Sequence, residues 1–503
     1  MTMKKKAACL TFLLAGAILT ASTIEAAKEP DKASVKQSFG NCTTLMAHGK
    51  AARGGGLIMA KNRDQAYMTP SAVMVQPHKK YLPGTTCKTV TITLPQVTET
   101  YAFTGSGSAG AFGVAFGINE KKVAVASNDA NSRDELTYEQ GLSDNDVVRL
   151  VLERAGSAKE GMELVAKLTE TYGQGYHGET YEIGDPNEIW VVETTGRRWA
   201  AKRYTDTVVS RANQFELTDD YDLCSEDLAT FANKMGWDSK TGKNKRLNFR
   251  AAYGGDKLNF SKDEPVAKRV SSPTLYESNI RHQRCDELLH ETLTTQGEIT
   301  VANIMSFLRD HFSIYRLPSG KTVDLRQIPF YASDYSATEQ REDVYKQPAG
   351  DTQTVPMYIH SICTHGLRSS TTSCSGIMVA QNQKPATMLC SLGTPCTGIF
   401  TPFFPVQTDV ENHYATAELS HTAIATNLLL IGYYEHFAPL VQKQLRPEEN
   451  QMLAETETLT ADTTPGQLTA FSQKQALQAY SLTEKAHRAL QQKHEQIFAH
   501  RHS

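Results

Sequence analysis

The chain has 503 residues, of which 40% are hydrophobic and 21% are charged, a composition that is ordinary for a globular protein. The formal net charge of −3 gives no electrostatic basis for binding nucleic acid or an anionic membrane surface, so we expect neither as a partner. The length allows one large domain or several smaller ones.

The N-terminal segment has the three parts of a secretory signal. Lysines at positions 4–6 precede an apolar run over residues 7–21, and small residues follow it. The apolar run is short for a membrane span. We expect residues 1–27 to be removed on export to the periplasm or the medium, with no membrane attachment afterwards. Residues 28–41 are polar and charged, which favours either a disordered linker or a removable propeptide.

The stretch that begins at Cys42 predicts a β-hairpin. Apolar residues alternate with polar ones after Cys42, glycines at positions 54–56 supply a turn, and a second apolar run leads into Lys61-Asn62-Arg63-Asp64. A hairpin folded on this turn brings Asp64 close to Cys42. If Cys42 became the first residue of a mature chain, its own α-amine could act as a base. Because thiols and α-amines have similar ordinary pKa values of about 8.5 and 7.7–8.0, we expect a thiolate at little cost.

The rest of the chain alternates between blocks of strands and helices. The predicted strands cover residues 90–94, 113–118, 123–126, 189–193 and 199–204, and the predicted helices cover residues 146–155 and a stretch that starts at Ser157. Ser157 and Glu160 have the spacing of a capping box. This order favours an α+β fold with antiparallel sheets stacked in layers, rather than a parallel βαβ array.

One glycine-rich stretch fits a nucleotide-binding pattern by letter only. Residues 105–110 read GSGSAG, but the following segment predicts a hairpin where a dinucleotide site needs a helix N-terminus. We therefore expect no nucleotide there, and a flexible loop near a binding cleft instead. The same stretch fails the GxSxG spacing of a serine hydrolase.

The cysteines predict disulfides more readily than a metal site. Nine are present, and loss of the signal removes Cys9. In an oxidising compartment, Cys363 could pair with Cys374, or Cys390 with Cys396. Zinc is the competing interpretation, but the sequence has no CxxC or HxxxH pairing, so we expect no metal and no cofactor. Residues 446–503 are polar and helical in pattern, which favours a solvated helical extension whose histidines bind no metal.

Several segments together resemble the dipeptidase A family of cysteine-type N-terminal-nucleophile (Ntn) hydrolases, which are related to bile-salt hydrolases and penicillin V acylases. The matching segments are Cys42-Thr43-Thr44-Leu45, the cluster at 61–64, the helix at 146–155, the strand entry at 185–193, Ala212-Asn213-Gln214-Phe215 and the stretch 393–404. The resemblance implies a four-layer αββα sandwich over residues 42–445 that cleaves dipeptides of broad sequence, with residues 446–503 as an extension.

The resemblance also implies roles for particular residues. Cys42 is the nucleophile, its α-amine is the base, and Asp64 orients that amine. Asn213 is the candidate for a second polar contact near the tetrahedral intermediate, and Asn128 for an oxyanion-hole asparagine.

Two positions leave alternatives open. Lys61 stands where the family usually has arginine, so it keeps the positive charge near the thiolate but loses the planar, bidentate guanidinium. A distal arginine of the family corresponds either to Arg281 or to Arg284.

Small peptides are the expected substrates, and a homo-oligomer remains open. Another Ntn amidase acting on bile-salt conjugates, acyl-lactones or penicillin is the first alternative, and a secreted binding protein on the same fold is the second. A papain-like peptidase is disfavoured, because its cysteine lies on a helix whereas Cys42 opens a strand.

Overall fold

The computed structural model describes residues 42–65, 69–134, 136–137, 140–237, 246–254, 273–311, 314–316, 322–324, 361–365, 371–430 and 434–499. All of them belong to one unit, Phe39–Ser503. The expected signal and propeptide, residues 1–41, lie outside the described residues.

A six-stranded antiparallel sheet carries the predicted hairpin. Its order is β14 (Val208–Arg211), β1 (Cys42–His48), β2 (Leu57–Gln65), β18 (Thr371–Ala380), β19 (Thr387–Leu392) and β20 (Thr401–Phe403). A single 3-10 turn, η1 (Gly49–Ala51), and the glycines at 54–56 connect β1 to β2. Cys42 pairs with Arg63 across the hairpin, which places the whole 61–64 cluster at the beginning of β1 and confirms the prediction.

An eight-stranded antiparallel sheet faces the first one. Its order is β15 (Leu223–Cys224), β13 (Arg198–Tyr204), β12 (Ile189–Thr195), β11 (Gly178–Gly184), β10 (Ala124–Ala130), β9 (Phe116–Asn119), β8 (Phe103–Ser108) and β3 (Ser71–Gln76). Three small pairs complete the described strands: β4 (Lys79–Lys80) with β7 (Glu99–Thr100), β5 (Thr86–Lys88) with β6 (Thr93–Pro95), and β16 (Ile314–Arg316) with β17 (Thr322–Asp324).

The two sheets pack through apolar side chains on their inner faces. Met46, Met59 and Met378 of the six-stranded sheet share one buried cluster with Phe116 and Ala126 of the eight-stranded sheet. Every second residue of a strand faces the same side of its sheet, so the residues between these ones face the outer helices.

Helices cover the outer face of the eight-stranded sheet. The helices α2 (Asp144–Arg154) and α3 (Ala158–Tyr172) bury their apolar faces with the outward residues of β10 to β12. Ser157 caps α3 as predicted, accepting a hydrogen bond from the N–H of Glu160. The Glu160 carboxylate accepts from Gly156 N–H, so the reciprocal bond of a capping box goes to the neighbouring residue.

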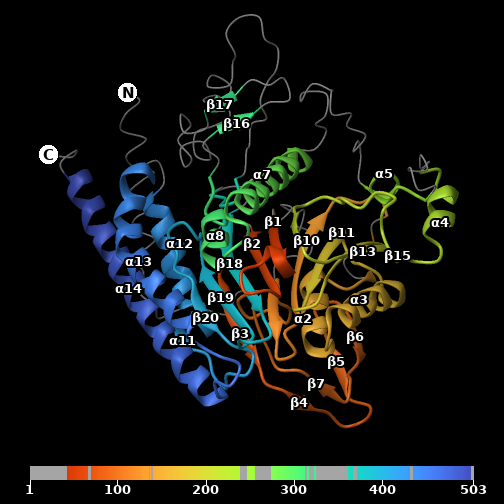
Figure 1. Cartoon of the computed structure of the whole chain (residues 1–503), viewed down its shortest axis with the longest axis horizontal. Coiled ribbons are helices and arrows are strands. Elements are labelled where there is room, and N and C mark those ends of the chain that lie inside the picture. The colour runs from red at the N-terminus through yellow and green to blue at the C-terminus, as the bar shows by residue number, and fades with distance from the viewer. Residues whose placement is uncertain are drawn as a thin grey trace, which may run out of the picture. The chain divides into compact units, whose positions relative to one another are not determined.

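Other helices cover the six-stranded sheet. Residues of α7 (Pro273–Gln296) and α8 (Val301–Phe307) share a buried cluster with the outer face of β1 and β2. Further along the sheet, α12 (Glu418–Leu430), α13 (Tyr434–Glu457) and α14 (Pro465–Ala499) lie beside β19 and β20, as Figure 1 shows in blue. The short helices are α4 (Leu228–Lys234), α5 (Phe249–Tyr253) and α11 (Asn412–Ala415). The fold is thus the predicted α+β, four-layer αββα sandwich.

The C-terminal extension differs from the solvated helix that its composition predicts. Ser472, Ala476 and Ala479 of α14 are at most 1% exposed, and α14 packs on β20. The expected boundary at residue 446 falls inside α13. The extension therefore forms part of the helical layer.

Two further local predictions hold only in part. The predicted strand at 90–94 is strand only from Thr93, where β6 begins; residues 90–92 form the turn before it, in which Thr89 N–H bonds Ile92 C=O and Val90 is 54% exposed. The glycine-rich stretch at 105–110 is mainly strand β8, paired with both β3 and β9, where a loop was expected. Gly105 has a packing reason, since a Cβ there would lie 2.8 Å from the Phe116 carbonyl oxygen.

The predicted disulfides are also wrong. All eight cysteines among the described residues are free thiols. Strand register and loop packing give Cys363 and Cys374 different neighbours from those that sequence proximity suggests. None of the helices in the described part of the chain is both long and apolar enough to cross a membrane.

Candidate active site around Cys42

Cys42 lies at the start of a central strand and is 6% exposed. Its backbone N–H donates a 2.6 Å hydrogen bond to Asn213 Oδ1. Asn213 follows β14, which pairs with β1, so strand pairing brings these two distant residues together.

Arg281 of α7 completes this group. Its Nη1 donates to the Cys42 carbonyl oxygen at 2.5 Å and to Thr43 Oγ1 at 2.8 Å, and its Nη2 donates to Asn213 Oδ1 at 2.8 Å. The side chain is fully buried. Arg284, one turn away, pairs instead with Asp310 at 2.8 Å. Arg281 is therefore the arginine that the fold places at Cys42.

The contacts of Asn213 fix the orientation of its amide. An arginine can only donate, so the atom that faces Arg281 and the Cys42 N–H must be the oxygen. The Nδ2 group donates to the Asp129 carbonyl oxygen at 3.0 Å. Asn213 Oδ1 thus holds the Cys42 nitrogen, and a contact of Asn213 with the tetrahedral intermediate stays a prediction.

Asp64 is buried at the end of β2. Its carboxylate accepts a hydrogen bond from Thr372 Oγ1 at 2.6 Å. Thr364 Oγ1 lies 3.5 Å from the same carboxylate and donates its proton to the Ser361 carbonyl oxygen at 2.8 Å. Thr364 N–H in turn donates to Thr372 Oγ1 at 3.0 Å. The backbone of Asp64 hydrogen-bonds the Cys42 thiol. The two threonines are functional neighbours that sequence reasoning missed, because about 300 residues separate them from Asp64.

Lys61 is a buried cation beside the thiol. Its Nζ donates to the Ser127 carbonyl oxygen. Burial by itself lowers the pKa of this ammonium, but the charges of Cys42, Asp144 and Glu179 outweigh burial and raise it. Lys61 therefore keeps its proton and provides a fixed positive charge.

The Cys42 thiol itself is hard to ionise in this environment. Burial raises its pKa to about 11; Lys61 opposes this increase, whereas Asp64 and Asp129 add to it. In the longer chain, whose Cys42 nitrogen is an amide, the thiolate is therefore costly; the expectation of an inexpensive thiolate concerns a chain that begins at Cys42 and stays a prediction. A base must take the thiol proton as the sulfur attacks.

Asn128 lies on β10 of the facing eight-stranded sheet. Its Nδ2 donates to Thr44 Oγ1 and to Glu182 Oε2, each at 2.9 Å. Thr44 is two residues after Cys42 and on the same face of β1. The structure thus brings Asn128 to Thr44, and its oxyanion role stays a prediction.

Arg63 faces the same inter-sheet side as Cys42, with which it pairs. It is 3% exposed, and its Nη2 donates to Ser108 Oγ at 2.8 Å. Its Nη1 is buried without a hydrogen-bond partner among the described residues. Ser108 also lines a cavity of about 420 Å³, a volume in the usual range for small-ligand sites. The sequence placed Arg63 in the cluster but gave it no role.

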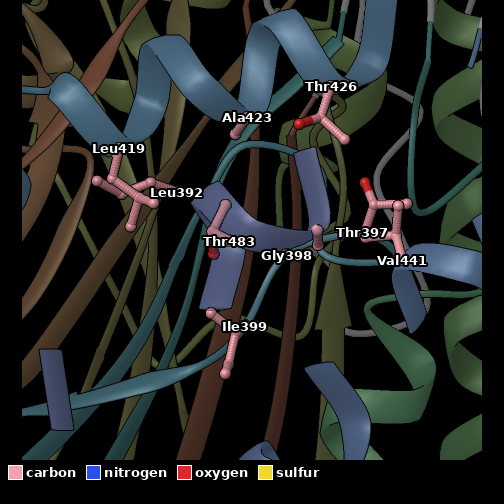
Figure 2. A pocket seen from close by; sticks show the side chains of 10 residues that line it. Leu392, Thr397, Gly398, Ile399, Leu419, Ala423, Thr426, Val441 and Thr483 are labelled. Atoms are coloured by element: carbon pink, nitrogen blue, oxygen red, sulfur yellow. The ribbon is translucent and has the colours of Figure 1, made fainter. Parts of the chain in front are cut away.

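A second cavity lies in the helical layer. Figure 2 shows it between α12, α13, α14 and the end of β19, with lining residues that include Leu392, Leu419 and Ala423. Its volume is about 10 Å³, room for about one water molecule. It is a packing defect in the helical layer.

The structure also gathers four metal-ligating side chains, although the sequence predicts no metal site. They are His311, Cys363, His365 and Cys396, whose donor atoms all lie within 4.8 Å of one another. Two thiols and two imidazoles are a donor set that zinc prefers. The pattern escapes a sequence search because loops from three parts of the fold supply it.

Two facing antiparallel sheets between helical layers, with a buried cysteine opening a central strand, define an αββα protein of the α+β class. The sequence profile of peptidase family C69 matches residues 41–427, and the chain belongs to this family. The predicted family membership is thereby confirmed.

Individual relatives are more distant. The chain is 29% identical to a probable dipeptidase of Latilactobacillus sakei over 43% of this chain and 49% of the relative. It is also 29% identical to a dipeptidase of Bifidobacterium longum, over 42% of this chain and 46% of that relative. The chain thus spans about half the length of the curated relatives it matches. Among solved structures, it is similar to a conjugated bile acid hydrolase of Clostridium perfringens, with 12% identity and a TM-score of 0.35. The match covers 72% of this chain and 92% of the hydrolase.

Proposed function

We propose that this chain is an exported cysteine dipeptidase in which Cys42, once it is the first residue, attacks the peptide bond of dipeptides of broad sequence. The observation that carries the proposal is the buried group in which Asn213 and Arg281 hold the backbone of Cys42 beside the Lys61 charge. Membership of a peptidase family supports it, as do two relatives named dipeptidases.

Removal of the preceding segment creates the base. In the longer chain the Cys42 nitrogen is an amide, whose lone pair is delocalised and not basic. Cleavage after Asn41 turns it into an amine. Asn213 Oδ1 then accepts one amine N–H, which orients the amine lone pair towards the thiol. Arg281 holds the carbonyl side of the same residue, so the amine and the sulfur keep a fixed geometry.

The reaction then follows from this geometry. The sulfur bonds to the scissile carbonyl carbon while the α-amine takes the thiol proton and delivers it to the leaving amine, which departs as the first product. Water, deprotonated by the α-amine, attacks the resulting thioester and releases the second amino acid. The thiol is restored. Lys61 lowers the energy of the thiolate formed on the way, opposing the increase in thiol pKa that burial causes.

Arg63 supports a substrate with a free carboxylate. Arg63 keeps one guanidinium nitrogen, Nη1, without a hydrogen-bond partner among the described residues, which suits a charged hydrogen bond to a carboxylate. The C-terminal carboxylate of a dipeptide lies one residue from the scissile bond, which fits the pairing of Arg63 with Cys42.

Hydrolysis assays on purified protein test the proposal. We expect wild-type protein and Cys224→Ala, a control that removes a half-buried thiol from edge strand β15, to cleave dipeptides. Cys42→Ala should lose roughly a thousandfold or more in turnover. A Cys42→Ala variant with full activity would rule out this nucleophile. Cleavage of acyl amides without cleavage of dipeptides would assign the site to another amidase.

Export rests on the sequence alone. A charged, apolar and small-residue order over residues 1–27 supports a secretory signal. We propose that signal removal is followed by loss of residues 28–41.

A further inference from the structure

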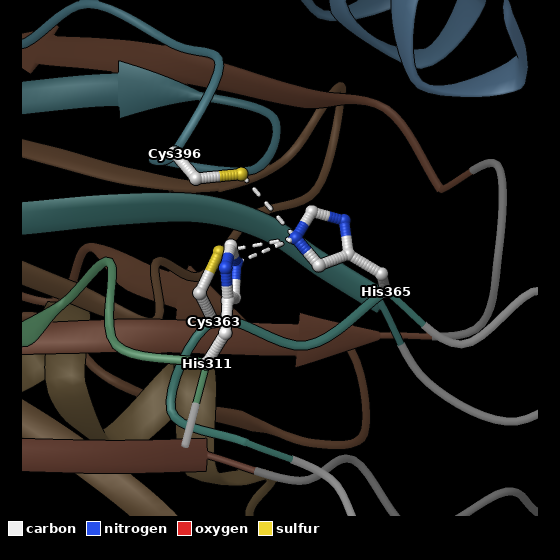
Figure 3. A group of neighbouring side chains, drawn as sticks. All are labelled: His311, Cys363, His365 and Cys396. Carbon is white, nitrogen blue, oxygen red and sulfur yellow. Dashed lines mark hydrogen bonds between the residues drawn. The ribbon is translucent and has the colours of Figure 1, made fainter. Parts of the chain in front are cut away.

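The four metal-ligating side chains come from three separate loops that meet next to β2, where Asn62 contacts Leu308 and Ile362. His311 follows α8, Cys363 and His365 lie in the segment just before β18, and Cys396 lies between β19 and β20. Figure 3 shows the side chains converging, with both thiols and the other imidazole directed at His365.

The distances have the size of a metal coordination sphere. His365 Nε2 lies 3.0 Å from His311 Nε2, 3.4 Å from Cys363 Sγ and 3.3 Å from Cys396 Sγ. In a tetrahedral zinc site with Zn–N near 2.0–2.1 Å and Zn–S near 2.3 Å, donor atoms lie about 3.3–3.8 Å apart. A small inward or outward adjustment of side chains therefore accommodates a central ion.

Burial and neighbouring groups also fit a structural site. Cys363, His365 and Cys396 are at most 5% exposed. Tyr434 Oη lies 3.5 Å from His311 Nδ1, so the outer ring nitrogen has a polar neighbour and Nε2 is left for the metal. Four protein ligands leave no open position for a substrate, which separates this site from a catalytic zinc.

A disulfide between Cys363 and Cys396 is the competing arrangement. A disulfide would join the two sulfurs. The two imidazole nitrogens would then face each other and the disulfide sulfurs, which are weak hydrogen-bond acceptors. A cation satisfies all four donors at once. We propose that His311, Cys363, His365 and Cys396 bind one structural Zn²⁺ ion.

The site has a defined connection to the neighbourhood of Cys42. Thr364, between two of the ligands, donates its N–H to Thr372 Oγ1 at 3.0 Å, and Thr372 Oγ1 donates to the Asp64 carboxylate at 2.6 Å. Asn62 Nδ2 donates to the carbonyl oxygens of Ile362 at 2.7 Å and Leu308 at 2.9 Å. A zinc ion would therefore fix the segment that holds Asp64 and Asn62, giving it a positioning role.

Metal analysis of the purified full-length protein tests the proposal independently of any peptidase activity. We expect about one zinc per wild-type chain and per Cys374→Ala chain, a control that removes a different fully buried thiol of β18. Cys363→Ser and His311→Ala should each hold less than about a tenth of that amount. Protein loaded with Co²⁺ should show thiolate-to-cobalt charge transfer and tetrahedral ligand-field bands.

The wild-type protein alone can overturn the proposal, whatever the folding of the variants. A chain that binds no zinc when the metal is supplied under reducing conditions would do so. A Cys363–Cys396 disulfide found by non-reducing peptide mass spectrometry would also overturn it. So would an absorption spectrum of the Co²⁺-loaded protein without thiolate-to-cobalt charge-transfer bands. Loss of dipeptidase activity with zinc still bound would count against the proposed function only.

Discussion

At the scale of single residues, Arg281 and Arg284 form a natural comparison. They lie on the same helix three positions apart, yet one is fully buried against Cys42 and Asn213 while the other forms a partly exposed ion pair with Asp310. Their identical chemistry and different surroundings separate a role at the site from a contribution to stability.

Replacing Arg281 by lysine should lower turnover at least about tenfold, because an ammonium cannot bridge Cys42, Thr43 and Asn213 with one rigid plane. Arg284→Lys should stay within about twofold of wild type in turnover, since Arg284 pairs with Asp310 and makes no hydrogen bond to Cys42 or Asn213. Steady-state kinetics with a melting curve for each variant measures both effects. Equal losses in the two variants would show that the arginines only stabilise α7.

Arg63 should act on substrate binding. For Arg63→Met we expect KM for dipeptides to rise about tenfold or more, because a charged hydrogen bond to a carboxylate contributes about 1.5–3 kcal/mol. For the same dipeptides with a C-terminal amide, wild type and variant should have similar KM values. If Arg63→Met raises KM equally for the dipeptides and for their C-terminal amides, the Nη1 of Arg63 does not contact a substrate carboxylate.

The sequence predicts correctly the part of the site that a single hairpin, β1–β2, brings together. Cys42, Lys61 and Asp64 meet because the turn at 54–56 fixes the register. The sequence named Asn213 but left Arg281 and Arg284 as alternatives, and the orientation of Asn213 depends on a contact with Arg281 that no local pattern encodes. Neither did local pattern reveal the burial that raises the pKa of the Cys42 thiol to about 11.

At the scale of elements, the strands that pair locally were predictable and the others were not. The hairpins β1–β2, β9–β10 and β12–β13 follow from alternation and turns between them. The stretch at 90–94 has the same alternation, but its turn bond from Thr89 to Ile92 leaves Val90 in solvent. Ile92 and Leu94 do pack on the core, and Leu94 lies in strand β6. Period alone therefore does not fix the residue at which a strand begins.

Gly376 of β18 tests how closely the sheets approach. A Cβ at this position would lie 2.0 Å from the ring of Phe116 on the facing sheet. We expect Gly376→Ala to lower the free energy of unfolding by about 1–3 kcal/mol through overpacking. Urea unfolding measures the loss. Adding Phe116→Leu should recover part of it, and additive losses would show that the two residues do not interact.

At the scale of the whole molecule, the space between the sheets holds carboxyl groups as well as apolar side chains. Burial raises the pKa of Glu182 to about 7 from an ordinary value of 4.5, against the opposing effects of Thr180 and Lys61. The folded state therefore favours the protonated carboxyl. This contribution to stability is complete below about pH 4.5 and is lost as the pH rises through about 7.

Glu182→Gln should remove this dependence. We expect the melting temperature of the variant to gain on that of wild type as the pH rises from 5 to 8, because glutamine stays neutral. Melting curves at constant ionic strength, compared as differences between the two proteins, cancel the titration of buried histidines such as His48. A difference that does not change with pH would mean that Glu182 is already ionised at pH 5.

The layered architecture was predictable from the resemblance and from the order of strands and helices. The role of the C-terminal helices was not, because the buried face of α14 consists largely of alanine, serine and glutamine, which a composition-based prediction assigns to solvent. The loop-built Cys2His2 group was missed for a similar reason: only tertiary packing brings its members together.

The identity of the N-terminal residue of the purified, active protein tests the central claim most directly. Intact mass should give a wild-type chain that begins at Cys42, with its α-amine free to act as the base. If Cys42→Ala keeps residues 28–41, the thiol also removes its own propeptide. A folded and active wild-type chain that still carries residues 28–41 would contradict the mechanism, because an amide nitrogen cannot take the thiol proton.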